Sequence, residues 1–350
     1  MNELVLIHTH GIGAVDYSSM KPEDLDSIER RAAADNLNII PGVFLARDYL
    51  AGFKDVLQRY AADPARFPHI LGFSVEGPLL GKIGGVPPRG IWSPNADEWS
   101  FIARLGELGL KYIVIGPDGG ELDDPLDGSV TFRDVIDLFY TSGVRIALGH
   151  YRRADPVLSA RRTDLVIDYV QQRYGPGPEV ILTDHLYNDM PRNFKHVWRT
   201  EAERAGRAGE LAEFLSVPWS DDTLDHILGP VPASIVRATK SDRIMPFLNF
   251  DGDHVDLEVC RRTLDYLGPK NVIGITDDTE LARLAGEDLA HHEGGLWYRS
   301  DGIVAAGTGH IDKQVANLER IGYEHAVRTL FRDNQLRALA PLLSASGARS

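Results

Sequence analysis

The chain has little cysteine, no long apolar run and no excess of basic residues, and each shortage excludes a class of protein. Its 350 residues include one cysteine, Cys260, so an internal disulfide framework is excluded and a reducing cytoplasm is expected. No apolar stretch approaches the roughly 20 residues needed to span a bilayer, and no segment resembles a signal peptide. The formal net charge of −14 argues against nucleic acid or an anionic membrane as a partner, although a few Arg or Lys side chains could still bind a small anionic ligand.

Apolar runs alternate with amphipathic segments along the chain, which is the pattern of a parallel sheet covered by helices. The runs predict eight strands, at residues 4–8, 39–44, 70–75, 112–115, 145–148, 180–183, 244–249 and 272–276. The segments between them predict helices, for example at residues 22–34, 95–108, 131–142, 156–173 and 255–267. Eight such units, with no Gly-x-Gly-x-x-Gly motif after the first strand, favour a closed (β/α)8 TIM barrel over an open Rossmann sheet. We expect one barrel domain at residues 1–343 and a disordered tail at residues 344–350.

One connection is much longer than the others. Residues 186–243 separate the sixth and seventh predicted strands, and an excursion of this length on the catalytic face predicts a lid, a specificity wall or an oligomer contact. Deleting residues 201–241 should then raise the Michaelis constant more than it harms folding. We also expect a homodimer or a higher homo-oligomer. Near the C-terminus, residues 294–309 predict a hairpin with its turn at Ser300-Asp301-Gly302.

Five residues that could bind a metal ion stand at or just after the ends of predicted strands. His8 and His10 are two apart, so the alternation of a strand directs both imidazoles to the same side. Glu76, His150 and His185 stand at three further strand ends. The carboxyl ends of barrel strands meet on one face, where active sites form. These ligands predict one or two divalent ions, with Zn²⁺ preferred, and Glu76 could serve one ion or bridge two.

Two further residues have the chemistry of hydrolysis. Asp277 is the first residue after the eighth strand, where a carboxylate could take a proton from a metal-activated water and return it to a leaving group. It could instead cap a following segment, a role equally open to Asp278. His254 follows the seventh strand and could donate a hydrogen bond to a substrate carbonyl, or it could be a solvated loop histidine.

Six segments of the chain together resemble a known family. HTHGIG, VEGPLL, LGHYRRAD, DHLYNDM, FDGDHV and GITDD occur in the order and spacing of the amidohydrolase superfamily. More narrowly, they resemble the N-acetylglucosamine-6-phosphate deacetylase family, whose segments read like HxHG, LEGPF, GHT, THLYNAM, ADGIHV and TDAM. The similarity runs from about His8 to Gly309, and the HLYN and Asp-Gly-x-His segments are its most specific parts.

The resemblance implies a barrel that binds one or two divalent ions. Glu76, His150 and His185 would form the main site. His8 and His10 would supply a second site, with Glu76 bridging the two. Members of the family usually also carry a β-sandwich domain, which we expect to be absent or vestigial in this chain.

The resemblance also implies roles in catalysis and substrate binding. Asp277 would be the general acid and base, and His254 would contact the amide carbonyl of the substrate. Asn188 matches a residue whose segment cradles the sugar phosphate in the family. The family's phosphate-binding arginine has no clean match here, and Asp189 adds negative charge at that place. The nearby basic candidates for substrate binding are Arg192, Lys195 and Arg199.

The expected function is therefore metal-dependent amide hydrolysis. A metal-bound hydroxide would deacetylate an N-acetylated amino sugar, phosphorylated or not, or a related small molecule. A deaminase or cyclic-amide hydrolase of a biosynthetic pathway would use the same centre on a different bond, and remains an alternative. A more remote alternative is a non-catalytic binding protein on the same barrel.

Overall fold

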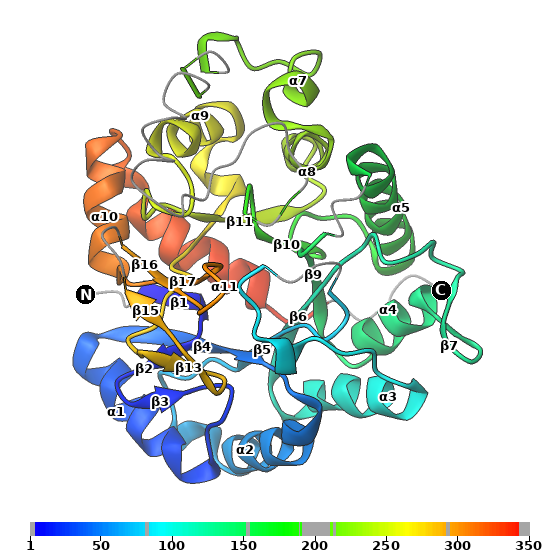
Figure 1. Ribbon diagram of the computed structural model, residues 1–350, viewed down its shortest axis with the longest axis vertical. Helices are drawn as coiled ribbons and strands as arrows, with labels where there is room; N and C mark the ends of the chain where they lie inside the picture. The colour runs from blue at the N-terminus through cyan, green and yellow to red at the C-terminus, as the bar shows by residue number, and fades with distance from the viewer. Residues whose placement is uncertain are drawn as a thin grey trace.

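The computed structural model describes residues 4–80, 84–151, 155–188, 190, 211–212, 215–291 and 295–342. Its central feature is a sheet of eight parallel strands that neighbour one another in chain order (Figure 1). The strands are β1 (Leu4–Thr9), β4 (Leu37–Phe44), β5 (Phe73–Glu76), β6 (Leu110–Ile115), β9 (Arg145–Leu148), β10 (Leu182–His185), β11 (Met245–Asn249) and β12 (Ile273–Ile275). Each of the eight predicted strands overlaps one of these.

The sheet closes into a barrel where its last strand meets its first. The amide of Asp277, just after β12, donates a hydrogen bond to the carbonyl oxygen of His8 at 3.0 Å. The amide of His10 donates to the carbonyl oxygen of Asp278 at 2.9 Å. Both bonds tie together the carboxyl ends of β1 and β12. The predicted (β/α)8 TIM barrel is confirmed.

Among the strand boundaries that differ from the prediction, those of β10 and β5 bear on the site. The sequence places the sixth strand at residues 180–183, whereas β10 covers Leu182–His185. Val180 and Ile181 are buried but precede the paired residues, so their apolar character does not mark where the strand begins. Similarly, Glu76 is the last residue of β5 and not the first residue after it.

Helices cover the outside of the barrel (Figure 1). The longer ones are α1 (Leu25–Asp35), α2 (Leu50–Ala62), α3 (Ala96–Arg104), α4 (Phe132–Thr141), α5 (Pro156–Tyr174), α8 (Pro230–Lys240), α9 (Leu257–Leu267) and α10 (Ile311–Arg320). At the start of α4, the Thr131 hydroxyl accepts a hydrogen bond from the Asp134 amide and the Asp134 carboxylate accepts one from the Thr131 amide. One face of α4 then packs against the sheet through Phe132, Val135, Ile136 and Phe139.

The alternation of side chains along the strands produces two apolar cores. In β1, Val5 and Ile7 point into the barrel interior, whereas Leu6 packs between the sheet and the helices. In β9, Ala147 lies in the interior core and its neighbours Ile146 and Leu148 lie in the outer one. The interior is filled with side chains, so the barrel is a packed core and not a pore.

Helix α11 (Asn334–Leu339) closes the amino-terminal end of the barrel. Its Asn334 side-chain amide donates to the carbonyl oxygen of Val272 at 2.6 Å, and that of Gln335 donates to the carbonyl oxygen of Gly274 at 2.9 Å. Ala338 belongs to the interior core. The opposite end, formed by the carboxyl ends of the strands, carries those predicted site residues that the structure describes.

The last part of the long connection forms a barrel helix. After α7 (Leu224–Leu228), α8 packs against α5 and α9 and serves as the crossover helix from β10 to β11. Its residues Val231, Ile235 and Val236 are fully buried. Deleting residues 201–241 would remove this helix, so the expectation that such a deletion spares folding does not hold. Residues 191–210 and 343–350 lie outside the described residues, so the lid and the tail remain predictions.

The predicted hairpin near the C-terminus is present. β16 (Leu296–Tyr298) and β17 (Val304–Gly307) are antiparallel, and β15 (Ala290–His291) adds a third strand that the sequence does not indicate. The other sheets outside the barrel, within the described ranges, have two strands each. They pair β2 (Gly11–Ile12) with β3 (Val15–Asp16), β7 (Pro125–Asp127) with β8 (Val130–Thr131), and β13 (Arg283–Leu284) with β14 (Glu287–Asp288).

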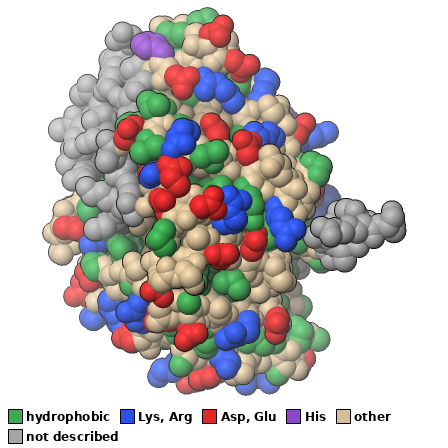
Figure 2. Space-filling view, turned by 90° about the vertical axis from the view of Figure 1, so that its right-hand side faces the viewer, with side chains coloured by type: hydrophobic (Ala, Val, Ile, Leu, Met, Phe, Trp, Pro, Cys, Tyr) green, Lys and Arg blue, Asp and Glu red, His purple; other side chains and the backbone are tan. Residues whose placement is uncertain are grey.

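The surface shows no extended apolar area on the part of the chain that the structure describes. Acidic and basic side chains are interspersed on the face shown in Figure 2. The exposed large hydrophobic residues among those described are Val157 and Leu336, which is too few for a large patch. No described helix combines the length and apolar character that crossing a membrane requires.

Candidate metal centre

The predicted ligands converge around Glu76 at the carboxyl ends of the strands. Glu76 Oε1 lies 2.5 Å from His150 Nε2. Its other oxygen, Oε2, lies 3.5 Å from Nε2 of His8 and 3.5 Å from Nε2 of His10. All four side chains are buried. The structure therefore places Glu76 between His150 on one side and the two histidines of β1 on the other.

His185 and its neighbour Asp184 complete the group. Asp184 Oδ2 lies 3.1 Å from His185 Nε2 and 3.1 Å from His150 Nε2, and its Oδ1 lies 3.3 Å from His8 Nδ1. The imidazole rings of His8 and His185 have centroids 5.3 Å apart. All five predicted ligands are thus brought together, with one carboxylate that the sequence analysis did not include.

These spacings fit a divalent ion. Zinc binds nitrogen and oxygen at about 2.0–2.2 Å, so two ligand atoms on one tetrahedral ion lie about 3.3 Å apart. Two sets of ligand atoms lie within 4.8 Å of one another, one from His8, Glu76, Asp184 and His185, and one from His8, His10 and Asp277. His8 belongs to both sets, so the sets adjoin, and His150 belongs to neither although its Nε2 contacts Glu76 and Asp184.

Unpaired buried atoms give a second reason to expect ions. Among the described residues, no hydrogen-bond partner exists for His8 Nε2, Glu76 Oε2, both ring nitrogens of His150 and both carboxylate oxygens of Asp184. Burying polar atoms without partners is unfavourable, and buried charges are normally paired or coordinate a metal. Cations among these atoms would satisfy them, so the residues fit the metal that the motifs predict.

The backbone at the site is unusual. His8, His150 and Asp277 have φ angles of 59°, 55° and 45°, which is the left-handed region that side chains other than glycine rarely adopt. Each such residue costs on the order of 1–3 kcal/mol and persists only where the surrounding structure enforces it. The backbone bond from Asp277 to His8 joins two of the three. The strain turns their side chains toward the cluster.

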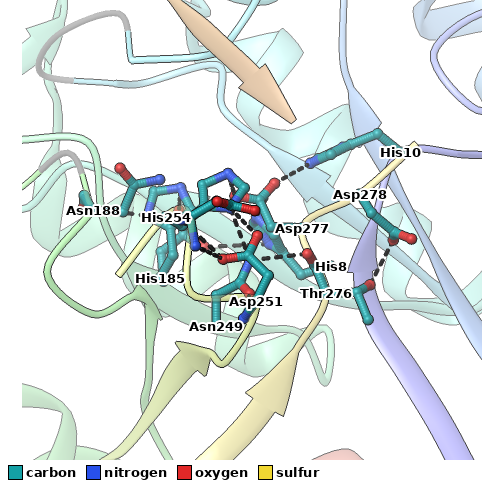
Figure 3. A network of polar contacts seen from close by, with 12 residues as sticks. His8, His10, His185, Asn188, Asn249, Asp251, His254, Thr276, Asp277 and Asp278 are labelled. Carbon is teal, nitrogen blue, oxygen red and sulfur yellow. Dashed lines mark hydrogen bonds and ion pairs between the residues drawn. The ribbon is translucent and has the colours of Figure 1, made fainter. Parts of the chain in front are cut away.

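Asp277 and His254 lie beside the predicted ligands (Figure 3). Asp277 Oδ1 is 3.3 Å from His10 Nε2, and its Oδ2 is 3.4 Å from His254 Nε2. His254 Nδ1 is 2.6 Å from Asp251 Oδ2, and the His254 side chain is 1% exposed. His254 is therefore not a solvated loop residue, and the three side chains form a chain that ends at the cluster.

Asp278 faces away from the cluster, which separates it from Asp277. Its Oδ1 accepts a hydrogen bond from Thr276 Oγ1 at 2.6 Å (Figure 3). Its Oδ2 lies 3.1 Å from His310 Nδ1. Neither aspartate caps a helix, because the chain continues from Asp278 into a bridge with β17. Asp277 is thus the carboxylate placed for chemistry.

The C-terminal hairpin packs directly against this part of the site. The amide of Gly307 in β17 donates to the carbonyl oxygen of Asp277 at 2.6 Å. A Cβ on Gly307 would lie 3.2 Å from Asp251 Oδ2 and 3.3 Å from His254 Cε1, so glycine permits this close approach. The hairpin thereby fixes the backbone of Asp277 and covers the pair formed by His254 and Asp251.

The charges in the cluster shift the pKa values of its members. Burial would raise the pKa of Asp277, but His254 and His10 lower it well below its usual range. Burial would lower the pKa of His254, but Asp251 and Asp277 raise it to about 9. Burial would likewise lower the pKa of His150, but Glu76 and Asp184 raise this pKa to about 10. At neutral pH Asp277 is therefore ionised, and His254 carries a proton on both ring nitrogens.

Two residues of the site were missed by reasoning from sequence. Asp184 directly precedes His185, and strict alternation along a strand would point it the other way. Asp251 stands in the turn segment DGDH, where an aspartate is ordinary. Its position three residues before His254 is the one signal that could have indicated the pair.

The predicted substrate-binding residues are only partly described. Asn188 is 7% exposed, and its backbone amide donates to the carbonyl oxygen of His185 at 3.0 Å. Its side chain lies beside the cluster in Figure 3. Arg192, Lys195 and Arg199 lie outside the described residues.

The fold is similar to solved structures of N-acetylglucosamine-6-phosphate deacetylases. The enzyme of Pasteurella multocida matches with a TM-score of 0.68 and 16% identity, over 97% of this chain and 76% of the other. That of Mycobacterium smegmatis has a TM-score of 0.67 and 18% identity, over 97% and 79% of the two chains. That of Thermotoga maritima has a TM-score of 0.66 and 16% identity, over 97% and 78%.

No family model matches the chain, and no curated protein matches it in sequence. At 16–18% identity the likeness is one of fold. The barrel fold that the resemblance of the six motifs implies is thereby confirmed.

Proposed function

We propose that this protein is a metal-dependent hydrolase of carbon–nitrogen bonds, which deacetylates an N-acetylated amino sugar or a related small molecule. The observation that supports this most strongly is the buried cluster of imidazoles and carboxylates with Asp277 and His254 beside it. The cluster lies at the carboxyl end of a barrel shared in fold with enzymes named as deacetylases of N-acetylglucosamine 6-phosphate.

The ions would be held by the predicted ligands. Glu76, His150 and His185 would hold the main ion, and His8 and His10 a second, with Glu76 between them. A bound divalent ion, for which Zn²⁺ is the first candidate, lowers the pKa of water and polarises an acyl oxygen.

Asp277 would move the proton. Its low pKa keeps the carboxylate ionised, so it can accept a proton from the attacking water. After the acyl carbon–nitrogen bond breaks, the same carboxyl group delivers that proton to the departing amine. Its Oδ1 faces His10 among the ligands and its Oδ2 faces His254 on the substrate side, so one group can serve both steps.

His254 would stabilise the acyl oxygen. Asp251 holds the Nδ1 proton at 2.6 Å, which leaves the Nε2 proton free to be donated to an oxygen that gains negative charge. The Asp251 carboxylate also supports the positive charge of the ring, since it raises the pKa of His254 to about 9. Asp251 is thus a positioning residue, and His254 is the group that would contact substrate.

The other end of the substrate would meet Asn188 and the segment that follows it. Basic side chains there would bind a phosphate if the sugar carries one, and Asp189 would oppose it. The candidates for this contact are Arg192, Lys195 and Arg199.

Replacing Asp277 by Asn tests the mechanism. Loss of the proton carrier should reduce kcat by about 10³-fold, within the range for general acid–base catalysis, while bound metal remains. The matched control is Asp278→Asn, because that carboxylate is equally buried and faces away from the cluster. Acetate release is measured with N-acetylglucosamine, its 6-phosphate and related N-acetyl sugars, alongside metal analysis of each variant.

The same panel distinguishes the alternatives. Ammonia released from amino heterocycles, with no acetate from any sugar, would indicate a deaminase instead. Full acetate release by Asp277→Asn would contradict the proposed mechanism. Protein purified from metal-supplemented medium without a bound ion would favour a non-catalytic binding protein.

A further inference from the structure

Asp184 faces the cluster because β10 is irregular. Thr183 pairs with Pro246 and His185 pairs with the next residue, Phe247, so the register shifts by one residue at Asp184. A bulge of this kind lets two consecutive side chains point the same way, which a regular strand does not allow. Asp184 and His185 therefore both reach the barrel interior, and Asp184 Oδ2 lies 3.1 Å from His185 Nε2.

The neighbouring strand makes room for this carboxylate. A Cβ on Gly149 would lie 2.4 Å from the Cβ of Asp184, so any larger residue at 149 would displace it. The Asp184 side chain is 0% exposed. Among the described residues, the ion pairs of its oxygens are with the imidazoles of His8, His150 and His185, which could equally be metal ligands. A carboxylate buried in this way requires a cation.

The charge balance of the centre points to two ions. Imidazoles are neutral when they ligate a metal, so Glu76, Asp184 and Asp277 would place three negative charges around them, while the charges of His254 and Asp251 beside the centre cancel. One divalent ion would leave a net negative charge next to the acyl oxygen that must become negative during hydrolysis. Two divalent ions bring four positive charges against three negative ones, which leaves one positive charge to stabilise that oxygen.

We propose that Asp184 is a metal ligand which, together with Glu76, makes this a two-ion centre. Asp184 would bind through the oxygens that face His8 on one side and His150 and His185 on the other. The motif THLYNAM, to which this segment is similar, has threonine at this position, so the carboxylate is a feature of this chain and not of the resemblance. The inference rests on the metal dependence in the proposed function, but it concerns the number of ions and their ligands.

Metal binding tests the proposal without using turnover. Wild type, Asp184→Asn and Asp278→Asn are stripped of metal and titrated with Zn²⁺, and the ions bound per chain are counted after equilibrium dialysis. Wild type and Asp278→Asn should bind two ions. Asp184→Asn should bind at least one of the two ions at least about tenfold more weakly than wild type does. The proposal would be overturned if Asp184→Asn bound two ions as tightly as wild type does. It would also be overturned if wild type bound a single ion at saturation.

Two further measurements cover the case in which the asparagine variant does not fold. In Asp184→Ser, the serine side chain is smaller than that of aspartate and fits beside Gly149. This variant should show the same weakened binding of Zn²⁺. Anomalous diffraction from wild-type crystals grown with Zn²⁺ needs no variant, and should show two ions with an Asp184 oxygen within about 2.2 Å of at least one. Ions that do not contact Asp184 would refute it. Two bound ions with no hydrolysis of any amide would instead refute the proposed function and leave this inference standing.

Discussion

The amino-terminal and carboxyl-terminal ends of the barrel differ in how their buried polar groups are paired. At the amino-terminal end, Arg145 Nε donates to the carbonyl oxygen of Glu179 at 2.7 Å and its Nη2 to that of Ala340 at 2.6 Å. At the carboxyl-terminal end, buried atoms of Asp184 and His150 have no hydrogen-bond partner among the described residues. The amino-terminal end thus pairs most of these groups within the protein, with Gln335 Oε1 as an exception among the described residues, whereas the carboxyl-terminal end holds several polar atoms that a ligand would satisfy.

The backbone does not separate the two ends in this way, although the apolar core does. Among the described residues, non-glycine φ angles in the left-handed region occur at His8, His150, Tyr187 and Asp277 at the carboxyl-terminal end, and also at Asn36 and Asp242, which precede β4 and β11 at the other end. Interior residues of the other end, such as Val5 and Ile273, are apolar and fully buried. The packed end would offset the strain and the unpaired charges of the metal centre.

The largest effect on stability is expected from removing the ions, because buried polar atoms at the carboxyl-terminal end lack hydrogen-bond partners among the described residues. A ligand present at about a thousand times its dissociation constant stabilises the folded state by about 4 kcal/mol, and chelation removes that contribution. Repulsion among Glu76, Asp184 and Asp277 would then add to the loss. Thermal unfolding measured with and without a chelator should show a melting temperature lower by several degrees, restored by adding Zn²⁺. An unchanged melting temperature would mean that the carboxyl-terminal end is stable without ions, and the contrast between the ends would fail.

A smaller effect is expected from a cavity at the opposite end. Ile273 lies in β12, four residues before Asp277, and its side chain belongs to the interior core. Ile273→Ala should lower the free energy of unfolding by about 3 kcal/mol, as large-to-small changes in cores do. Because the cavity is distant from the ligands, the number of ions bound per chain should not change. Loss of an ion in this variant, measured in folded protein, would show that the two ends are coupled.

The part of the molecule that was predictable from sequence follows the same division. The apolar runs located all eight strands, because burial on both faces imposes a continuous apolar pattern. Because the carboxyl ends of barrel strands meet on one face, the sequence also predicted that five ligands lie together there. They are His8, His10, Glu76, His150 and His185. The sequence did not predict Asp184 among them, because a bulge depends on how two strands pair and leaves no mark in the alternation of one of them.

Two other features required coordinates for similar reasons. The pairing of Asp251 with His254 depends on a turn whose aspartates all appear alike in sequence. The sequence did not predict α8, because this helix follows a stretch of the long connection that has no clear hydrophobic period. The length of the connection alone suggested a lid. The amount of chain between two strands thus says less about function than the burial of the residues within it, such as Val231 and Ile235.

The smallest effect on stability is expected from removing the cap of α4, one of the helices that cover the outside of the barrel. Thr131 caps α4 by accepting a hydrogen bond from the Asp134 amide at 3.2 Å, and the hydrogen bonds described for its side chain join it to Asp134 and not to a predicted ligand. Thr131→Ala removes this bond and should lower the free energy of unfolding by about 1 kcal/mol. Denaturant unfolding of the metal-loaded and metal-free forms should show the same decrease in both, since the cap does not contact the centre. A decrease that appears only in the metal-free form would mean that the ions stabilise the outer helices as well, and that the metal centre is not confined to one end of the barrel.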